Sequence, residues 1–117
     1  MKARLVRFGE IEIAGHSYNH DVVIDKGEVH KRKKKNSKPY QAQYGHTPLS
    51  AEEDIPWGGK SLIIGTGLYG RLPVMPEVIA EGEQRGIKVI AVPTEEACKM
   101  LSKQELETAN AILHITC

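Results

Sequence analysis

The sequence has few cysteines, few aromatic residues and no long apolar segment. Cysteine occurs twice in 117 residues, too rarely for the disulfide framework of a small secreted domain, and this pattern suits a reducing cytoplasm. One Trp and one Phe are present, so the core must consist mainly of Val, Ile and Leu. The apolar runs are far shorter than the roughly 20 residues of a membrane-spanning helix. We therefore expect a cytoplasmic protein without a membrane segment.

The sequence also lacks an excess of charge of one sign. Its formal net charge is +1, which favours neither a nucleic acid nor a membrane as the partner. The N-terminal segment alternates charged and apolar residues and has no continuous apolar stretch, so we expect no signal peptide. The length suits one domain, which we predict over residues 1–117.

Residues 1–33 have the period-two pattern of β-strands. Charged and apolar residues alternate, as they do in half-buried strands, and glycines interrupt the runs. The stretch Asp25-Lys26-Gly27-Glu28 is a good hairpin turn, because glycine accepts positive φ. We predict a β meander with strands over residues 4–8, 10–13, 21–24 and 29–33, the last of them at an edge.

Residues 34–59 form a long connection without a sustained period. Ser50-Ala51-Glu52-Glu53 has the spelling of a capping box, which predicts one short helix that Pro56 ends. A connection of this length in a small domain is often functional.

Residues 60–117 predict a βαβαβ core. Apolar strands are expected over 60–64, 87–92 and 111–115. One helix begins at Pro76 and ends at Gly86, and Thr94 is expected to cap the next. Strands that alternate with helices indicate a parallel sheet with right-handed crossovers, so we predict the α/β class.

The first of these strands runs into Gly65-Thr66-Gly67-Leu68-Tyr69-Gly70, which has the spelling G-x-G-x-x-G. A dinucleotide site needs a helix that begins at the glycines, but Pro73 and Pro76 displace the helix from them. No Gly-Lys-Ser/Thr follows either, which excludes a Walker A loop. We interpret the motif as a tight turn and expect no cofactor. Backbone donors of Gly65 to Gly67, with Arg71 nearby, remain an alternative site for a small anion.

Three stretches resemble a known family: Leu62-Ile63-Ile64-Gly65-Thr66-Gly67, Gln84-Arg85-Gly86-Ile87-Lys88-Val89 and Leu113-His114-Ile115-Thr116-Cys117. Together they are similar to the Mth-type domain family of unknown function. Its relatives include the human adipogenesis-associated Mth-domain protein and a mitochondrial complex I assembly factor. The resemblance implies a single three-layer α/β domain, with a mixed central sheet and an additional antiparallel β layer. It implies a role in assembly or regulation, and no catalytic residues.

The candidate ligand site combines the glycine turn with the long connection. We predict that Gly65, Thr66, Gly67 and Arg71 lie near His46 and Trp57 and bind a small anion or a partner. The protein would then be a non-catalytic binding or assembly module, and a protein partner or a second copy of the chain stays open. The alternative is an enzyme that acts on a small anionic substrate in the same cleft, with His46 and the acids at 52–54 as acid–base groups.

A second candidate site is a run of basic residues followed by tyrosines. Cations neutralise phosphates and aromatic rings stack on bases, so the run would suit RNA or single-stranded DNA. The alternative is a solvated edge strand and loop. The residues are Lys31, Arg32, Lys33, Lys34, Lys35 and Lys38, with Tyr40 and Tyr44.

Two further groups of reactive side chains carry no predicted chemistry. His16, His20 and Asp21 lie close together in the sequence, but zinc needs more ligands in a defined geometry, so we expect no metal site. Cys98 lies in the first turns of a predicted helix beside two glutamates, and we interpret it as a buried apolar residue.

Overall fold

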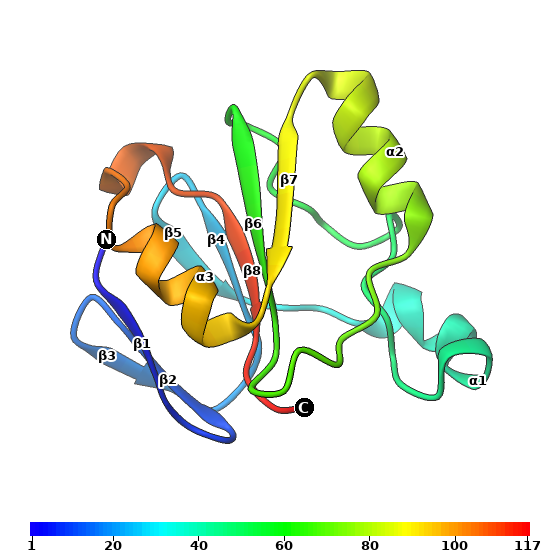
Figure 1. Ribbon diagram of the computed structural model, residues 1–117, viewed down its shortest axis with the longest axis horizontal. Helices are drawn as coiled ribbons and strands as arrows, with labels where there is room; N and C mark the ends of the chain where they lie inside the picture. Colours follow the sequence, from blue (N-terminus) through cyan, green and yellow to red (C-terminus); the bar gives the residue numbers. More distant parts are fainter.

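The structure is a computed structural model that describes residues 1–117, apart from the side chain of Leu106. Its strands form a three-stranded antiparallel sheet and a five-stranded mixed sheet, and helices pack on the larger sheet (Figure 1). The predicted α/β class, with a mixed central sheet and an additional β layer, is thereby confirmed.

The small sheet is formed by β1 (Ala3–Arg7), β2 (Glu10–Ile13) and β3 (His16–Tyr18). The two apolar residues of β2, Ile11 and Ile13, are fully buried, as their alternation with glutamates predicts. Strand β3 was not expected, because the Gly15-His16-Ser17 stretch reads as a break. It forms because these polar residues pair with β2 across a tight turn, with Ile13 opposite His16.

The central sheet has the strand order β5-β4-β8-β6-β7. Strand β6 is parallel to both β7 and β8, whereas β4 is antiparallel to β8 and to β5. The prediction of one β meander over residues 1–33 is wrong in its second half, because β4 and β5 belong to the central sheet. The strands are β4 (Val22–Asp25), β5 (Glu28–Lys31), β6 (Ser61–Thr66), β7 (Lys88–Val92) and β8 (Ala111–His114).

Different elements cover the two faces of the central sheet. Helix α3 (Thr94–Leu101) and the small sheet cover one face, where Ile63 of β6 is buried. Helix α2 (Pro76–Arg85) and residues 49–57 cover the other face, where the neighbours Leu62 and Ile64 are buried. The period-two alternation of β6 therefore fills two separate cores. A short 3₁₀ turn, η2 (Leu106–Thr108), precedes β8.

The long connection contains helical turns, but not where the capping box predicts them. The 3₁₀ helix η1 (Lys35–Tyr40) runs directly into α1 (Gln41–Tyr44). The predicted helix at Ser50 is wrong, because residues 51–53 form only a turn. The Glu53 side chain does not cap a helix and instead pairs with Arg32 in the interior. None of the helices in the described part of the chain has the length and apolar character to cross a membrane.

Candidate functional site

The candidate site lies at the carboxyl ends of β6 and β8, near the C-terminus marked in Figure 1. From β6 the chain passes through α2 to β7 on one side, and α3 then returns it to β8 on the other side of β6. The strand order thus reverses between β6 and β8. Such a reversal opens a crevice at the carboxyl ends of the strands, which is where open α/β sheets bind ligands.

The glycine motif forms a turn that holds the last residues of the chain. Gly67 has a φ of 107°, which glycine adopts without strain. The backbone N–H of Leu68 donates to the oxygen of Thr116 (2.7 Å), and that of Arg71 donates to the oxygen of Cys117 (3.0 Å). Helix α2 begins only at Pro76, which confirms that the helix is displaced from the glycines. The turn is therefore built around the C-terminal segment.

Thr94 connects this turn to β8 rather than capping α3. Its hydroxyl accepts a hydrogen bond from the N–H of Gly67 (2.8 Å) and donates one to the carbonyl oxygen of His114 (2.5 Å). Thr94 is the first residue of α3, and it makes no side-chain cap. The predicted cap is wrong because the hydroxyl bonds Gly67 and His114 instead. Gly67 donates to Thr94, and Gly65 and Thr66 are buried in β6. Of the four residues predicted here to bind an anion, Arg71, which directly follows the motif, is the one that lines a hollow.

A hollow of about 180 Å³ lies between the turn, the end of β8 and the long connection. Arg71 comes from the turn, Lys34 and His46 from the connection, and His114, Thr116 and Cys117 from the end of the chain. No carboxylate side chain lines the hollow in the part of the chain that the structure describes. The charged side chains of the lining are therefore the two cations Lys34 and Arg71, with His46 and His114 beside them.

Trp57 lies apart from this hollow. It lines a larger groove of about 650 Å³, together with Lys31, Lys33 and Arg85. The guanidinium of Arg85 lies 5.3 Å from the centre of the Trp57 ring, a distance typical of a cation–π contact. The structure thus brings His46 and Arg71 together, as the sequence predicts, and places Trp57 at a different site.

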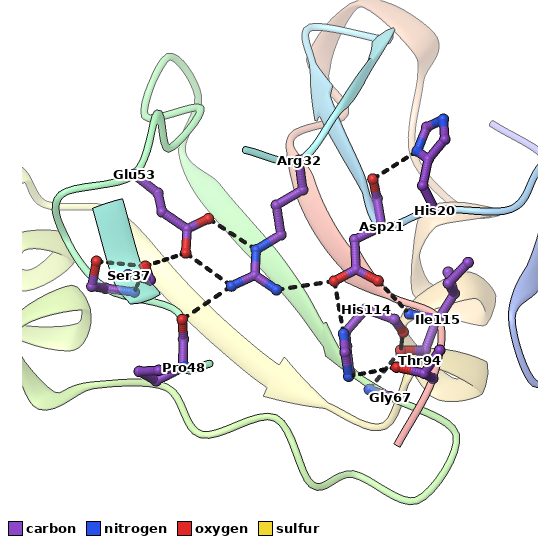
Figure 2. A network of polar contacts seen from close by, with 12 residues as sticks. His20, Asp21, Arg32, Ser37, Pro48, Glu53, Gly67, Thr94, His114 and Ile115 are labelled. Carbon is purple, nitrogen blue, oxygen red and sulfur yellow. Dashed lines mark hydrogen bonds and ion pairs between the residues drawn. The ribbon is translucent and has the colours of Figure 1, made fainter. Parts of the chain in front are cut away.

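His114 is held by the groups around its ring (Figure 2). Nδ1 lies 2.7 Å from Oδ2 of Asp21, and Nε2 lies 3.1 Å from the hydroxyl of Thr116. The side chain is 13% exposed, so one edge of the ring reaches the hollow. An ionised Asp21 accepts a hydrogen bond and cannot donate one, so Nδ1 carries the proton of this contact.

Asp21 is the buried partner of three donors. Besides His114, the backbone N–H of Ile115 donates to it (3.0 Å), and Arg32 donates through Nη1 (2.9 Å). Burial alone would raise the pKa of the Asp21 carboxyl. The hydrogen bond and charge of His114, with smaller contributions from Ile115 and Arg32, outweigh burial and lower the pKa to about 2. The carboxylate is therefore ionised at neutral pH.

Arg32 joins Asp21 to a second carboxylate in the interior. It is 3% exposed, and its Nε and Nη2 bond both oxygens of Glu53 at 2.9 and 2.8 Å. Nη2 also donates to the carbonyl oxygen of Pro48 (3.1 Å), and the hydroxyl of Ser37 donates to Glu53 (Figure 2). Burial lowers the pKa of Arg32, but the two carboxylates reverse this and raise it above its usual value. All three nitrogens of the guanidinium are hydrogen-bonded and the side chain is buried, so Arg32 is not part of a basic surface.

The lysines next to Arg32 are exposed but do not share one surface. Lys31 and Lys33 line the groove at Trp57, whereas Lys34 lines the hollow at His114. Because the extended chain alternates its side chains, Lys31 and Lys33 lie on the side opposite to Arg32 and Lys34, and Arg32 is buried. Tyr40, predicted to stack on bases, donates its hydroxyl hydrogen to Glu52, and this hydrogen bond raises its pKa. Exposed Lys35 and Lys38 follow in η1.

Sequence reasoning missed Asp21, Glu53 and His114 as members of one site. Asp21 and His114 are 93 residues apart, and only the pairing of β4 with β8 brings them together. The available signal was a charged residue next to an apolar strand in each case, Asp21 before β4 and His114 at the end of β8. As a metal site these residues do not qualify, since the described side chains include no cluster of three His, Cys, Asp or Glu in a suitable arrangement.

Fold and site together define an α/β domain with a buried ionic network beneath a basic hollow at the switch point of its sheet. The family described as "Protein of unknown function (DUF498/DUF598)" matches residues 4–113, and the chain belongs to this family.

Two solved structures resemble the chain over nearly its full length. The conserved hypothetical protein PH1505 from Pyrococcus horikoshii OT3 is 32% identical with a TM-score of 0.73, and the match covers 100% of both chains. The protein titled MT938 is 25% identical with a TM-score of 0.71, over 99% of this chain and 98% of that one. No curated protein matches the chain.

Proposed function

We propose that the protein is a binding module for a compact oxyanion, which occupies the basic hollow. The observation that carries the proposal is the meeting of Lys34, His46, Arg71 and His114 around one space that no described carboxylate side chain lines. Charge-assisted hydrogen bonds from the two cations of this set, Lys34 and Arg71, are the strongest that proteins offer to an oxyanion. Arg71 presents a planar fork to two oxygens, and Lys34 adds a point charge.

The size of the hollow restricts the ligand. A volume of about 180 Å³ corresponds to about six water molecules in the liquid, at about 30 Å³ each. Sites for drug-sized ligands usually have about 300–1,000 Å³. Phosphate, sulfate or a small carboxylate fits this space, whereas a dinucleotide does not. The free thiols of Cys98 and Cys117 suit the reducing cytoplasm as the location of this function.

Calorimetric titration with inorganic phosphate tests the proposal. We expect saturable binding, weakened about tenfold or more by Arg71→Gln or Lys34→Gln, because each removes a charged donor worth about 1.5–3 kcal/mol. Lys60→Gln, at an exposed lysine outside the hollow, is the matched control and should bind as the wild type does. Absence of phosphate binding, or an unchanged affinity in Arg71→Gln, would contradict the proposal.

A partner that presents a phosphate or carboxylate group could use the same hollow. Binding of such a partner would be compatible with the assembly role that the Mth-type resemblance implies. Titration with a phosphorylated peptide in place of phosphate extends the same experiment to this case.

Exposed lysines support a second candidate function, the binding of single-stranded nucleic acid. Lys33, Lys35 and Lys38 are exposed, and none of them forms an ion pair with a described side chain. Release of counterions from a nucleic acid makes such binding strongly dependent on salt. Replacing Lys35 and Lys38 with Gln should weaken oligonucleotide binding and flatten its salt dependence, and absence of binding at low salt would exclude this function.

A further inference from the structure

The two nitrogens of His114 have different surroundings. Nδ1 lies 2.7 Å from Asp21, which Arg32 and the N–H of Ile115 hold in place from other directions. The proton of the neutral ring is therefore kept at Nδ1, and the lone pair of the ring lies on Nε2. A histidine fixed in one tautomer by a buried carboxylate is oriented for chemistry at its other nitrogen.

We infer from its neighbour that Nε2 is the nitrogen on the side of the hollow. Its neighbour is the hydroxyl of Thr116 at 3.1 Å, and both His114 and Thr116 line the hollow. Lys34 and Arg71 line the same space and would neutralise the oxygens of a phosphoryl group. A nucleophilic nitrogen and cations for phosphate oxygens thus meet in a space of about 180 Å³.

We propose that Nε2 of His114 accepts a phosphoryl group from a small activated phosphate, such as an acyl phosphate or a phosphoramidate. This proposal rests on the proposed function, since the donor is the oxyanion that the hollow holds. The small volume favours a compact donor of this class over a nucleoside triphosphate.

The transfer is a displacement at phosphorus without oxidation or reduction. The lone pair of Nε2 accepts the hydrogen bond of the Thr116 hydroxyl, so this hydrogen bond opens first. The lone pair then forms the new N–P bond, and the bond from phosphorus to the leaving group breaks. With phosphoramidate the leaving nitrogen keeps the electron pair, takes up a proton from water and departs as ammonia. Nδ1 keeps its proton, and the carboxylate of Asp21 stabilises the positive charge that develops on the ring. Asp21 is thus a positioning residue and His114 the residue that reacts.

Incubation of the full chain with potassium phosphoramidate, followed by intact-mass and peptide mass spectrometry, tests the proposal. We expect one phosphoryl group on His114. Because N–P bonds are labile in acid and stable in base, the group should be lost in acid and retained in base. This behaviour distinguishes it from phosphothreonine at Thr116, which is stable in acid. His114→Gln should abolish the adduct, since its amide can still donate to Asp21 but offers no nucleophile. His16→Gln, at an exposed histidine on β3, should label as the wild type does.

Asp21→Asn tests the positioning role, with labelling expected to be about 100-fold slower because the ring loses its fixed orientation. If this variant unfolds, His114→Gln still decides the proposal. Equal labelling of several histidines, or no labelling of His114, overturns the proposal that His114 accepts the phosphoryl group. Phosphate binding without transfer leaves the proposed function intact and refutes only the phosphoryl acceptor, whereas the absence of both refutes both.

Discussion

At the scale of single residues, Asp21 links the stability of the fold to pH. Its pKa is lowered from 3.8 to about 2 in the folded state, so folding favours the ionised carboxyl. The resulting stabilisation, about 2 kcal/mol, is complete above pH 3.8 and is lost as the pH falls towards 2. Urea unfolding between pH 5 and pH 2 should therefore show a falling free energy of unfolding, with a smaller slope in Asp21→Asn.

Asp54→Asn is the control for this measurement, because Asp54 is exposed and forms no ion pair with the described side chains. It should keep the wild-type slope. An Asp21→Asn variant with the same pH dependence as the wild type would show that this carboxyl does not carry the linkage.

At the scale of elements, Gly67 determines how closely the turn after β6 approaches the chain's last residues. Its φ is 107°, and a Cβ at this position would overlap the carbonyl carbon of Cys117. We expect Gly67→Ala to lower the free energy of unfolding by about 2–3 kcal/mol. We also expect weaker phosphate binding, since the displaced residues Thr116 and Cys117 line the hollow. Urea unfolding and calorimetry measure the two effects.

Gly86→Ala is a matched control for the conformational part of this effect. Gly86 ends α2 with a φ of 69°, but its Cβ would meet nothing within 4 Å. Its substitution should cost only about 1 kcal/mol and leave phosphate binding unchanged. Equal losses of stability in both variants would mean that the contact with Cys117 is unimportant.

The same scale shows which elements the sequence could predict. The βαβαβ core was predictable because its signals are local: apolar strands, Pro76 at one helix start and Gly86 at its end. No helix forms at Ser50 and Thr94 makes no side-chain cap. In both places the side chain that local rules assign to the helix makes a tertiary contact instead. Glu53 pairs with Arg32, and the Thr94 hydroxyl connects Gly67 to His114.

At the scale of the whole molecule, the site depends on pairings that the sequence does not specify. The meeting of Arg71 and His46 was predictable, because a long connection beside a glycine turn was expected to fold over it. The pairing of Asp21 with His114 was not, because it requires β4 to leave the N-terminal strands and join β8. The burial of Arg32 was not predictable from the basic run either, because composition does not show which side chain of an extended segment points inward.

Arg32 connects distant parts of the molecule, so its loss should affect more than one element. It joins the start of β4, through Asp21, to the long connection, through Glu53 and Pro48. Arg32→Met leaves two buried carboxylates without their cation, and we expect the free energy of unfolding to fall by about 3–5 kcal/mol. Arg32→Lys should recover only part of this loss, because an ammonium cannot reproduce the two-pronged contact with Glu53.

Lys33→Met is the control, since it changes the exposed neighbour in the same segment and should alter stability by less than about 0.5 kcal/mol. Hydrogen exchange should show where the network acts. In Arg32→Met, the amides of residues 34–59 should exchange faster than they do in the wild type, and this increase should be larger than that of the amides of β6 and β8. Because Lys34 and His46 belong to this connection, the same variant should bind phosphate more weakly although Arg32 does not line the hollow. Wild-type stability and unchanged exchange in Arg32→Met would show that the buried ions do not hold the connection against the sheet.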